Sequence, residues 1–149
     1  MKNAVLICAA AVWCAAPAMA DANGDATHEI LALERHAMDG WVTGDPGPAL
    51  AICDPEITYF HAITEKRLDG LPALRDLYEK FRGMTLFDRY EILDPRVQFA
   101  GDVAVLTYHF VRHNGAAASH WNATQVYQQQ KEGWRVIHSH WSMVQPRQQ

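Results

Sequence analysis

The second half of the chain constrains the fold most, because it consists of four strand-like runs separated by tight turns. The runs span residues 90–99, 103–113, 120–131 and 134–144. Short glycine-containing turns of the kind found in β-hairpins connect them: Ala100-Gly101-Asp102, Asn114-Gly115-Ala116 and Glu132-Gly133. Pro95 lies inside the first run, which indicates a bulge or an edge position. The sequence therefore predicts a meander of antiparallel strands over residues 90–144.

The part of the chain between residue 20 and the strand-like runs has the pattern of helices with one strand among them. Residues 27–42 carry apolar side chains at helical spacing, after an irregular start at 21–26. Residues 47–53 predict a short second helix, and residues 57–62 alternate as a strand does. Gly70-Leu71-Pro72 opens a third helix that ends at Gly83. This order predicts an α+β fold in which three N-terminal helices pack on a strongly curved, mixed or antiparallel sheet.

The N-terminus has the pattern of a secretory signal peptide. Lys2 precedes an apolar run from Ala4 to Ala16, and Ala18-Met19-Ala20 is a small-x-small cleavage motif. The apolar run is too short to span a membrane. We therefore expect residues 1–20 to be removed after Ala20, leaving one domain, residues 21–149, in the periplasm or outside the cell.

Charge and cysteine content exclude several classes of protein. Without Lys2 the chain has 12 basic residues against 17 acidic ones, and the basic residues form no stripe. Nucleic-acid and membrane partners are therefore not expected. Of the three cysteines only Cys53 lies beyond residue 20, which excludes an intramolecular disulfide in the mature chain. We expect Cys53 to be a buried, inert thiol.

A set of short motifs shares its order with a known superfamily. The motifs are Cys53-Asp54-Pro55, Thr58 with Phe60, Gly70-Leu71, Ile92-Leu93-x-Pro95, Gly101-Asp102 and Gly133-Trp134-x-Val136-Ile137-His138-x-His140-x-Ser142. Across residues 28–144 the chain resembles the NTF2-like (SnoaL-like, ketosteroid-isomerase-like) superfamily, and within it the association domain of calcium/calmodulin-dependent protein kinase II.

The resemblance implies a cone-shaped domain with a pocket between helices and concave sheet, and oligomer contacts through the outer face of the sheet. The superfamily includes isomerases, cyclases, dehydratases and non-catalytic oligomerisation modules, so the resemblance alone leaves the function open. Where the association domain places pocket arginines, this chain has Phe110, Gln125 and Trp141, and Leu74 replaces a histidine of the third helix.

Strand alternation predicts which side chains line the pocket. With Leu74 from the third helix, they are Tyr59, His61, Tyr108, Phe110, Gln125, Tyr127, Ser139 and Trp141. His61 is the candidate catalytic residue, since imidazole suits a general base near neutral pH, and Gln125 or Tyr59 is a candidate oxyanion donor. The alternative is a structural histidine bonded to Tyr59 or to the backbone. No acidic residue is expected well inside the pocket-facing strands, which disfavours a two-carboxylate mechanism.

The same alternation directs a set of histidines outwards. His138 and His140 share one face of the last strand, and we expect an oligomer interface formed by His109, His120, Trp134, His138 and His140, with His113 on the same side. A transition-metal site there is the less favoured alternative, and neither a metal nor a cofactor is predicted.

Three functions agree with these patterns. The first is an exported protein that binds a small apolar molecule bearing one or two polar groups, as a homodimer or higher homo-oligomer. The second is an isomerase, cyclase or dehydratase with His61 as its base. The third is an oligomerisation module without catalysis.

Overall fold

The computed structural model describes the backbone of residues 16–145 and the side chains of residues 22–145. Its elements are α1 (Ala16–Val42), α2 (Gly47–Ala51), β1 (Cys53–His61), β2 (Leu68–Asp69), α3 (Leu71–Tyr78), the 3₁₀ turn η1 (Glu79–Phe81), β3 (Arg89–Ala100), β4 (Val103–Asn114), β5 (Ala117–Gln130) and β6 (Gly133–Met143). The six strands form one mixed sheet in the order β2-β1-β6-β5-β4-β3. Only β1 and β6 run parallel; the other neighbours are antiparallel. The predicted α+β class, with helices packed on a strongly curved mixed sheet, is confirmed.

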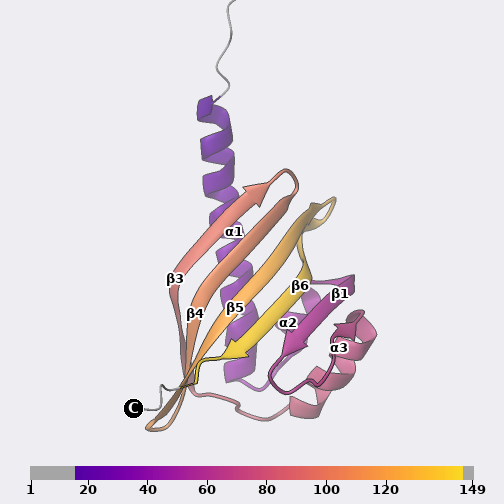
Figure 1. The fold of residues 1–149 in the computed structure, drawn as a ribbon, viewed down its shortest axis with the longest axis vertical. Helices are drawn as coiled ribbons and strands as arrows, with labels where there is room; N and C mark the ends of the chain where they lie inside the picture. The colour runs from indigo at the N-terminus through magenta and orange to yellow at the C-terminus, as the bar shows by residue number, and fades with distance from the viewer. Residues whose placement is uncertain (1–15, 146–149) are drawn as a thin grey trace, which may run out of the picture.

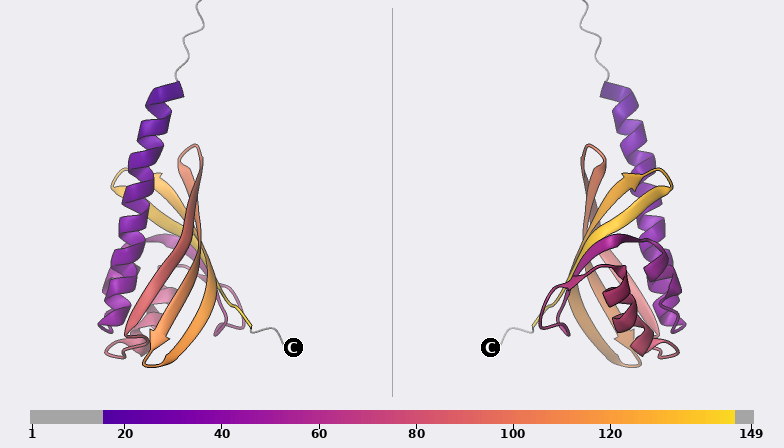
Figure 2. Two further views of the ribbon diagram at one scale, coloured as in Figure 1. Left: turned by 90° about the vertical axis from the view of Figure 1, so that its left-hand side faces the viewer. Right: turned by 90° about the vertical axis from the view of Figure 1, so that its right-hand side faces the viewer.

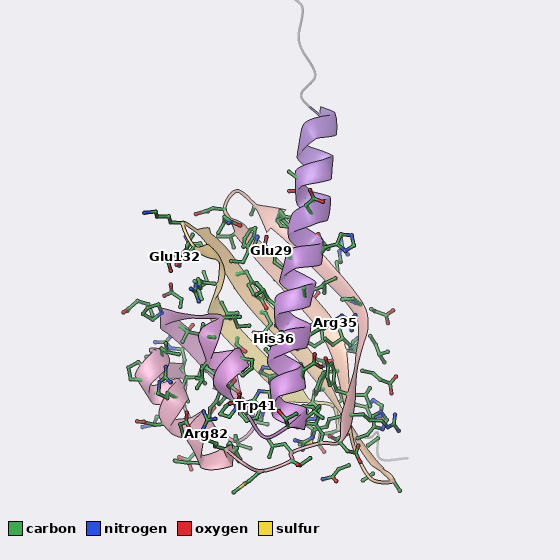
Figure 3. All side chains as sticks on the ribbon, turned by 180° about the vertical axis from the view of Figure 1, so that it is seen from behind. Glu29, Arg35, His36, Trp41, Arg82 and Glu132 are labelled. Carbon is green, nitrogen blue, oxygen red and sulfur yellow. The ribbon has the colours of Figure 1, made fainter. Side chains whose placement is uncertain are left out.

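The sheet is strongly curved, and the helices cover one of its faces (Figures 1 and 2). Seen from behind, α1 crosses the strands diagonally, and Trp41 lies near its C-terminal end (Figure 3). The apolar residues of α1 pack onto the concave face, as their helical spacing predicts. Because no helix within residues 16–145 covers the opposite face (Figure 2), side chains directed there are available for contacts with other molecules.

A bulge at Pro95 confirms the predicted irregularity of the strand over 90–99. In β3 the pairing with β4 shifts between Leu93 and Arg96, and Asp94 has a positive φ of 49°. The strand also lies at the edge of the sheet. An edge position tolerates proline because its missing amide donor is not needed by a neighbour.

A second bulge in β6 corrects the predicted position of Trp134. Tyr127 pairs with Val136, whereas the preceding residue of β5, Val126, pairs with His138, so Ile137 is the extra residue. The bulge reverses the alternation of the residues before it. Trp134 is therefore buried in the core, 7% exposed and against Phe99, rather than on the outer face with the histidines.

The N-terminal expectations are corrected in part. Residues 21–26 are helical, because α1 starts at Ala16 and continues through them. Residues 1–15 of the expected signal peptide lie outside the described residues, and cleavage after Ala20 stays a prediction. The second helix ends at Ala51, so Cys53 begins β1. No helix in the described part of the chain is long and apolar enough to cross a membrane.

Cys53 matches the expectation of an inert thiol. Its Sγ donates a hydrogen bond of 3.1 Å to the Ala49 carbonyl. Burial, with the negative charge of Glu34 as the next cause, raises the pKa of the Cys53 thiol to about 12. A thiol with so high a pKa carries almost no thiolate at neutral pH, and the thiolate is the reactive form.

Candidate functional site

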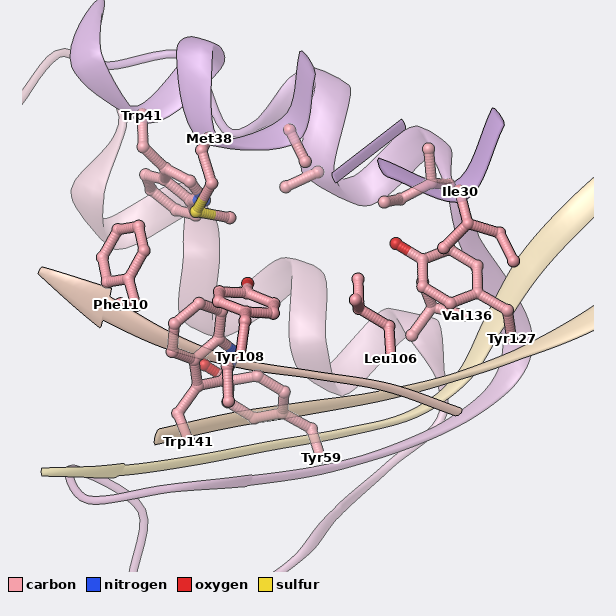
Figure 4. Close-up of a cluster of buried hydrophobic side chains, with 14 of the residues drawn as sticks. Ile30, Met38, Trp41, Tyr59, Leu106, Tyr108, Phe110, Tyr127, Val136 and Trp141 are labelled. Carbon is pink, nitrogen blue, oxygen red and sulfur yellow. The ribbon is translucent and has the colours of Figure 1, made fainter. Parts of the chain in front are cut away.

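A cavity of about 240 Å³ lies between the concave face of the sheet and two parts of the helical layer, the C-terminal end of α1 and the segment formed by α3 and η1. Aromatic rings from seven elements and the loop before β3 form most of its wall: Trp41, Tyr59, Tyr78, Phe81, Phe87, Phe110, Trp121 and Trp141. Figure 4 shows how Met38 and Trp41 of α1 face Phe110 and Trp141 of the sheet. An aromatic wall of this kind suits the apolar body of a small molecule.

The rings hold one another in fixed orientations. Phe110 meets Trp141 edge to face at 5.3 Å, and Tyr78 meets Trp41 edge to face at 4.8 Å between ring centroids. Edge-to-face packing at such distances is favourable beyond the burial of the rings. The cavity wall is therefore preorganised.

Two nitrogen-bearing side chains interrupt the apolar wall at one place. Arg112 of β4 lies over the Trp121 ring at 5.1 Å, and His61 of β1 packs against the same ring at 5.1 Å. Ser119 accepts a 2.8 Å hydrogen bond from Arg112 Nε, which fixes the guanidinium, and among the described residues no side chain bonds to its outer nitrogens. We call Arg112 and His61 the donor pair.

His61 is a neutral hydrogen-bond donor in this arrangement. Its Nδ1 accepts a 3.2 Å hydrogen bond from the Ile63 amide, so the neutral ring carries its proton on Nε2. Burial, and then the positive charge of Arg112, lower the pKa of His61 to about 4. At neutral pH the donor pair thus consists of one cation and one uncharged N–H group.

A second, smaller cavity of about 30 Å³ adjoins the first and shares Met38, Tyr59, Tyr78 and Trp141 with it. Its lining includes Glu34 of α1, which is 1% exposed. Tyr108 donates to Glu34 Oε1 at 2.5 Å, Tyr127 donates to Oε2 at 2.6 Å, and Gln125 donates to Oε1 at 3.4 Å. We call these four residues the Glu34 cluster. Burial raises the pKa of Glu34, and these three hydrogen bonds oppose the shift.

The predicted pocket residues all face the concave side, but they divide between the two cavities. Tyr59 and Trp141 line both, His61 and Phe110 line the larger one, and Leu74, Gln125 and Ser139 line the smaller one. Tyr108 and Tyr127 line neither cavity; their hydroxyl groups donate hydrogen bonds to Glu34 instead.

Sequence reasoning missed Glu34 and Arg112. The expectation about acidic residues concerned only the pocket-facing strands, and Glu34 reaches the smaller cavity from α1. Glu34 follows Ile30 by four residues and precedes Ala37 by three, so the helical period was the available signal. Arg112 continues the inward alternation of Tyr108 and Phe110 and was equally accessible from the sequence.

The predicted interface histidines lie on the face of the sheet that no helix covers. His138 Nδ1 forms a 2.8 Å hydrogen bond with Thr58 Oγ1, and the exposed ring of Phe60 packs between His138 and His140 at 6.0 and 5.6 Å. His109 bonds to Asn122, and His120 is exposed on β5. Among the described residues, no three side chains of His, Cys, Asp or Glu are arranged to hold a metal ion.

An α-helical layer on a curved mixed sheet, with an aromatic cavity between them, defines an NTF2-like domain. The family profile of the calcium/calmodulin dependent protein kinase II association domain matches residues 26–145. The chain belongs to this family. A comparison with curated proteins gives no match.

Solved structures agree with this assignment. A candidate ketosteroid isomerase from Parabacteroides distasonis is 32% identical with a TM-score of 0.68, covering 78% of this chain and 86% of that one. An NTF2-like protein of unknown function from Pseudomonas putida is 28% identical with a TM-score of 0.72, covering 80% and 87%. The kinase hub of S. rosetta is 22% identical with a TM-score of 0.65, covering 77% and 94%, and shares the fold.

Proposed function

We propose that this protein binds a small, largely apolar molecule that carries one acidic group. The apolar body occupies the aromatic cavity, and the carboxylate or similar anion contacts the donor pair. A planar guanidinium with free outer nitrogens is well suited to a carboxylate. The volume of about 240 Å³ suits a molecule of one or two rings.

The observation that carries this proposal is the position of Arg112. A half-buried cation is costly unless an anion compensates it, and within the described residues Arg112 has no carboxylate partner. Burial lowers the pKa of Arg112, the direction in which desolvation acts on a cation. A bound anion would remove that penalty and accept a second hydrogen bond from His61 Nε2.

Isothermal titration calorimetry with phenylacetate, cyclohexylacetate and the uncharged phenylacetamide tests the proposal. The acids should bind more tightly than the amide, and Arg112→Met should weaken the acids by about tenfold or more while leaving the amide unchanged, as expected for a hydrogen bond to a charged group. Arg89→Met, at an exposed position of β3, is the matched control. Equal affinities of acid and amide for the wild type would refute the assignment.

A proton-transfer enzyme is the second candidate. It is favoured by the neutral imidazole in the cavity and by the similarity to a candidate ketosteroid isomerase. As a base, His61 would have to release the Ile63 amide from Nδ1, so that Nδ1 either accepts the substrate proton or takes up the ring proton and leaves Nε2 free to accept. Loss of turnover in His61→Ala with retained fold, on a ketone or hydroxy acid that wild type converts, would favour this candidate over simple binding.

Oligomerisation and export complete the proposal. The matched family is that of a kinase association domain, and its solved members include kinase hubs, which supports a homo-oligomer built on the uncovered face of the sheet. The pattern of Lys2, the apolar run and Ala18-Met19-Ala20 supports export with cleavage after Ala20. Mass spectrometry of protein expressed with its own N-terminus in a bacterial periplasm tests the cleavage site.

A further inference from the structure

All three buried polar side chains among the described residues line the same small cavity. Glu34, Gln125 and Ser139 are 1%, 4% and 5% exposed, and each lines the cavity of about 30 Å³. The remaining wall is apolar, with Leu74, Ile57 and Val136 among its members. A core of this size needs no carboxylate for packing, and a buried carboxylate is destabilising unless it is compensated. This concentration of polar groups therefore points to a binding role.

The hydrogen bonds at Glu34 leave room for one more donor. An ionised carboxylate offers about four acceptor sites on its two oxygens. Tyr108, Tyr127 and Gln125 occupy three of them, and no Lys, Arg or His of the described residues forms an ion pair with Glu34. The described side chains supply donors to Glu34 and no cation, so a donor from outside the chain would complete its coordination.

The volume of the smaller cavity limits which chemical group can enter it. A cavity of about 30 Å³ holds a group of one or two heavy atoms and no ring. It adjoins the larger cavity through Met38, Tyr59, Tyr78 and Trp141, which line both. Methionine is unbranched and flexible, so Met38 is the side chain most able to give way between them.

We infer that the Glu34 cluster is a second polar subsite of the same pocket, and that it binds a hydroxyl or ammonium group at the end of the ligand opposite the acidic group. This inference rests on the proposed function and specifies its ligand as bifunctional. An anion contacts Arg112 and His61 at one end, an apolar ring fills the aromatic cavity, and a terminal hydrogen-bond donor reaches Glu34.

Calorimetry on the full chain with pairs of acids tests the inference. The probes are phenylacetate and its homologues with one and two further methylenes, each compared with the same acid bearing a 4-hydroxyl or a 4-aminomethyl group. At least one substituted acid should bind about tenfold more tightly than its parent. The hydroxyl and aminomethyl arms show which donor the subsite prefers.

Glu34→Gln separates the subsite from the rest of the pocket. The variant should lose the gain from the added donor while binding the unsubstituted acids within about twofold of wild type, and Glu29→Gln, exposed on the same helix, should change neither. If the acids bind through Arg112 but no added donor improves affinity in the wild type, the inference is wrong and the proposed function stands. If no acid binds, both fail. The wild-type comparison decides the matter even where Glu34→Gln does not fold.

Discussion

The Tyr127 hydroxyl on β5 donates a 2.6 Å hydrogen bond to Glu34 Oε2 on α1, joining helix and sheet inside the core. Tyr108 of β4 does the same at Oε1. Figure 4 shows the Tyr127 hydroxyl directed at α1 beside Ile30. Because both tyrosines act as donors, they stabilise the ionised form of a carboxyl group whose burial favours the protonated form. The fold therefore holds a titratable group whose charge is coupled to its stability.

We predict that Glu34 makes the protein less stable as the pH rises. Its pKa is raised above the ordinary value of 4.5, so the folded state binds the proton more tightly than the unfolded state. The contribution is fully present below pH 4.5 and is lost as the pH rises through the raised pKa, with a slope of up to about 1.4 kcal/mol per pH unit. Urea unfolding of wild type and Glu34→Gln from pH 4 to 8 measures the difference.

The variant comparison isolates Glu34 from the histidines. His61 has a lowered pKa and contributes the opposite slope, but it is present in both proteins and cancels. Glu29→Gln, at an exposed position of the same helix, should follow the wild-type curve. If the free energies of unfolding of wild type and Glu34→Gln change in parallel across this pH range, the pKa of Glu34 is the same in the folded and unfolded states.

The imidazole of His61 should titrate near pH 4 and stay neutral at pH 6, because burial is the main cause of its lowered pKa. Arg112→Met removes the second cause, so the pKa should rise without returning to 6.5. Histidine ring signals in NMR spectra recorded from pH 3.5 to 8 measure both values. A midpoint near 6.5 in the wild type would mean that the ring is hydrated and outside the aromatic cavity.

The sequence predicts the face on which a strand residue lies only where the strand pairing is regular. In β4 and β5 the strand register is unbroken, so alternation placed Tyr108, Phe110, Gln125 and Tyr127 correctly on the concave side. In β6 one extra residue, Ile137, reversed the side of Trp134, and no turn residue or proline marks that bulge in the sequence. Bulges form where tertiary packing demands them, which local patterns do not record.

The candidate site needed contacts between distant elements. Glu34 and Tyr127 are 93 residues apart, and a lone acidic residue on an apolar helix face looks like an interruption of the pattern. Its partners become visible only when α1 is laid across the sheet. Cys53 needed no such information, because a single cysteine beside apolar residues already indicates an inert thiol, and the structure shows it half-buried with a raised pKa.

Substitution of Trp134 tests the corrected face of β6. Trp134→Ala removes a buried indole from the core and should lower the free energy of unfolding by about 3–5 kcal/mol. Phe60→Ala, at a side chain that is 41% exposed on the uncovered face, should cost a monomer less than about 1 kcal/mol. Denaturation at low protein concentration measures both changes in stability. A small effect of Trp134→Ala would mean that Trp134 lies on the surface and not in the core.

Acid should weaken the homo-oligomer that we propose for the uncovered face. His138 and His140 flank Phe60 there, with His109 and His120 on the neighbouring strands and Arg67 near His138. Burial, then His140 and Arg67, lower the pKa of His138, so packing of a second subunit against it would oppose its protonation further. Protonation of His138 in acid would therefore place a positive charge beside Arg67 in the interface and favour the separated subunits. Size-exclusion chromatography with light scattering should show a smaller species at pH 5, and His138→Gln with His140→Gln should reduce this pH dependence. One unchanged species from pH 5 to 8 would exclude the histidines from the contact.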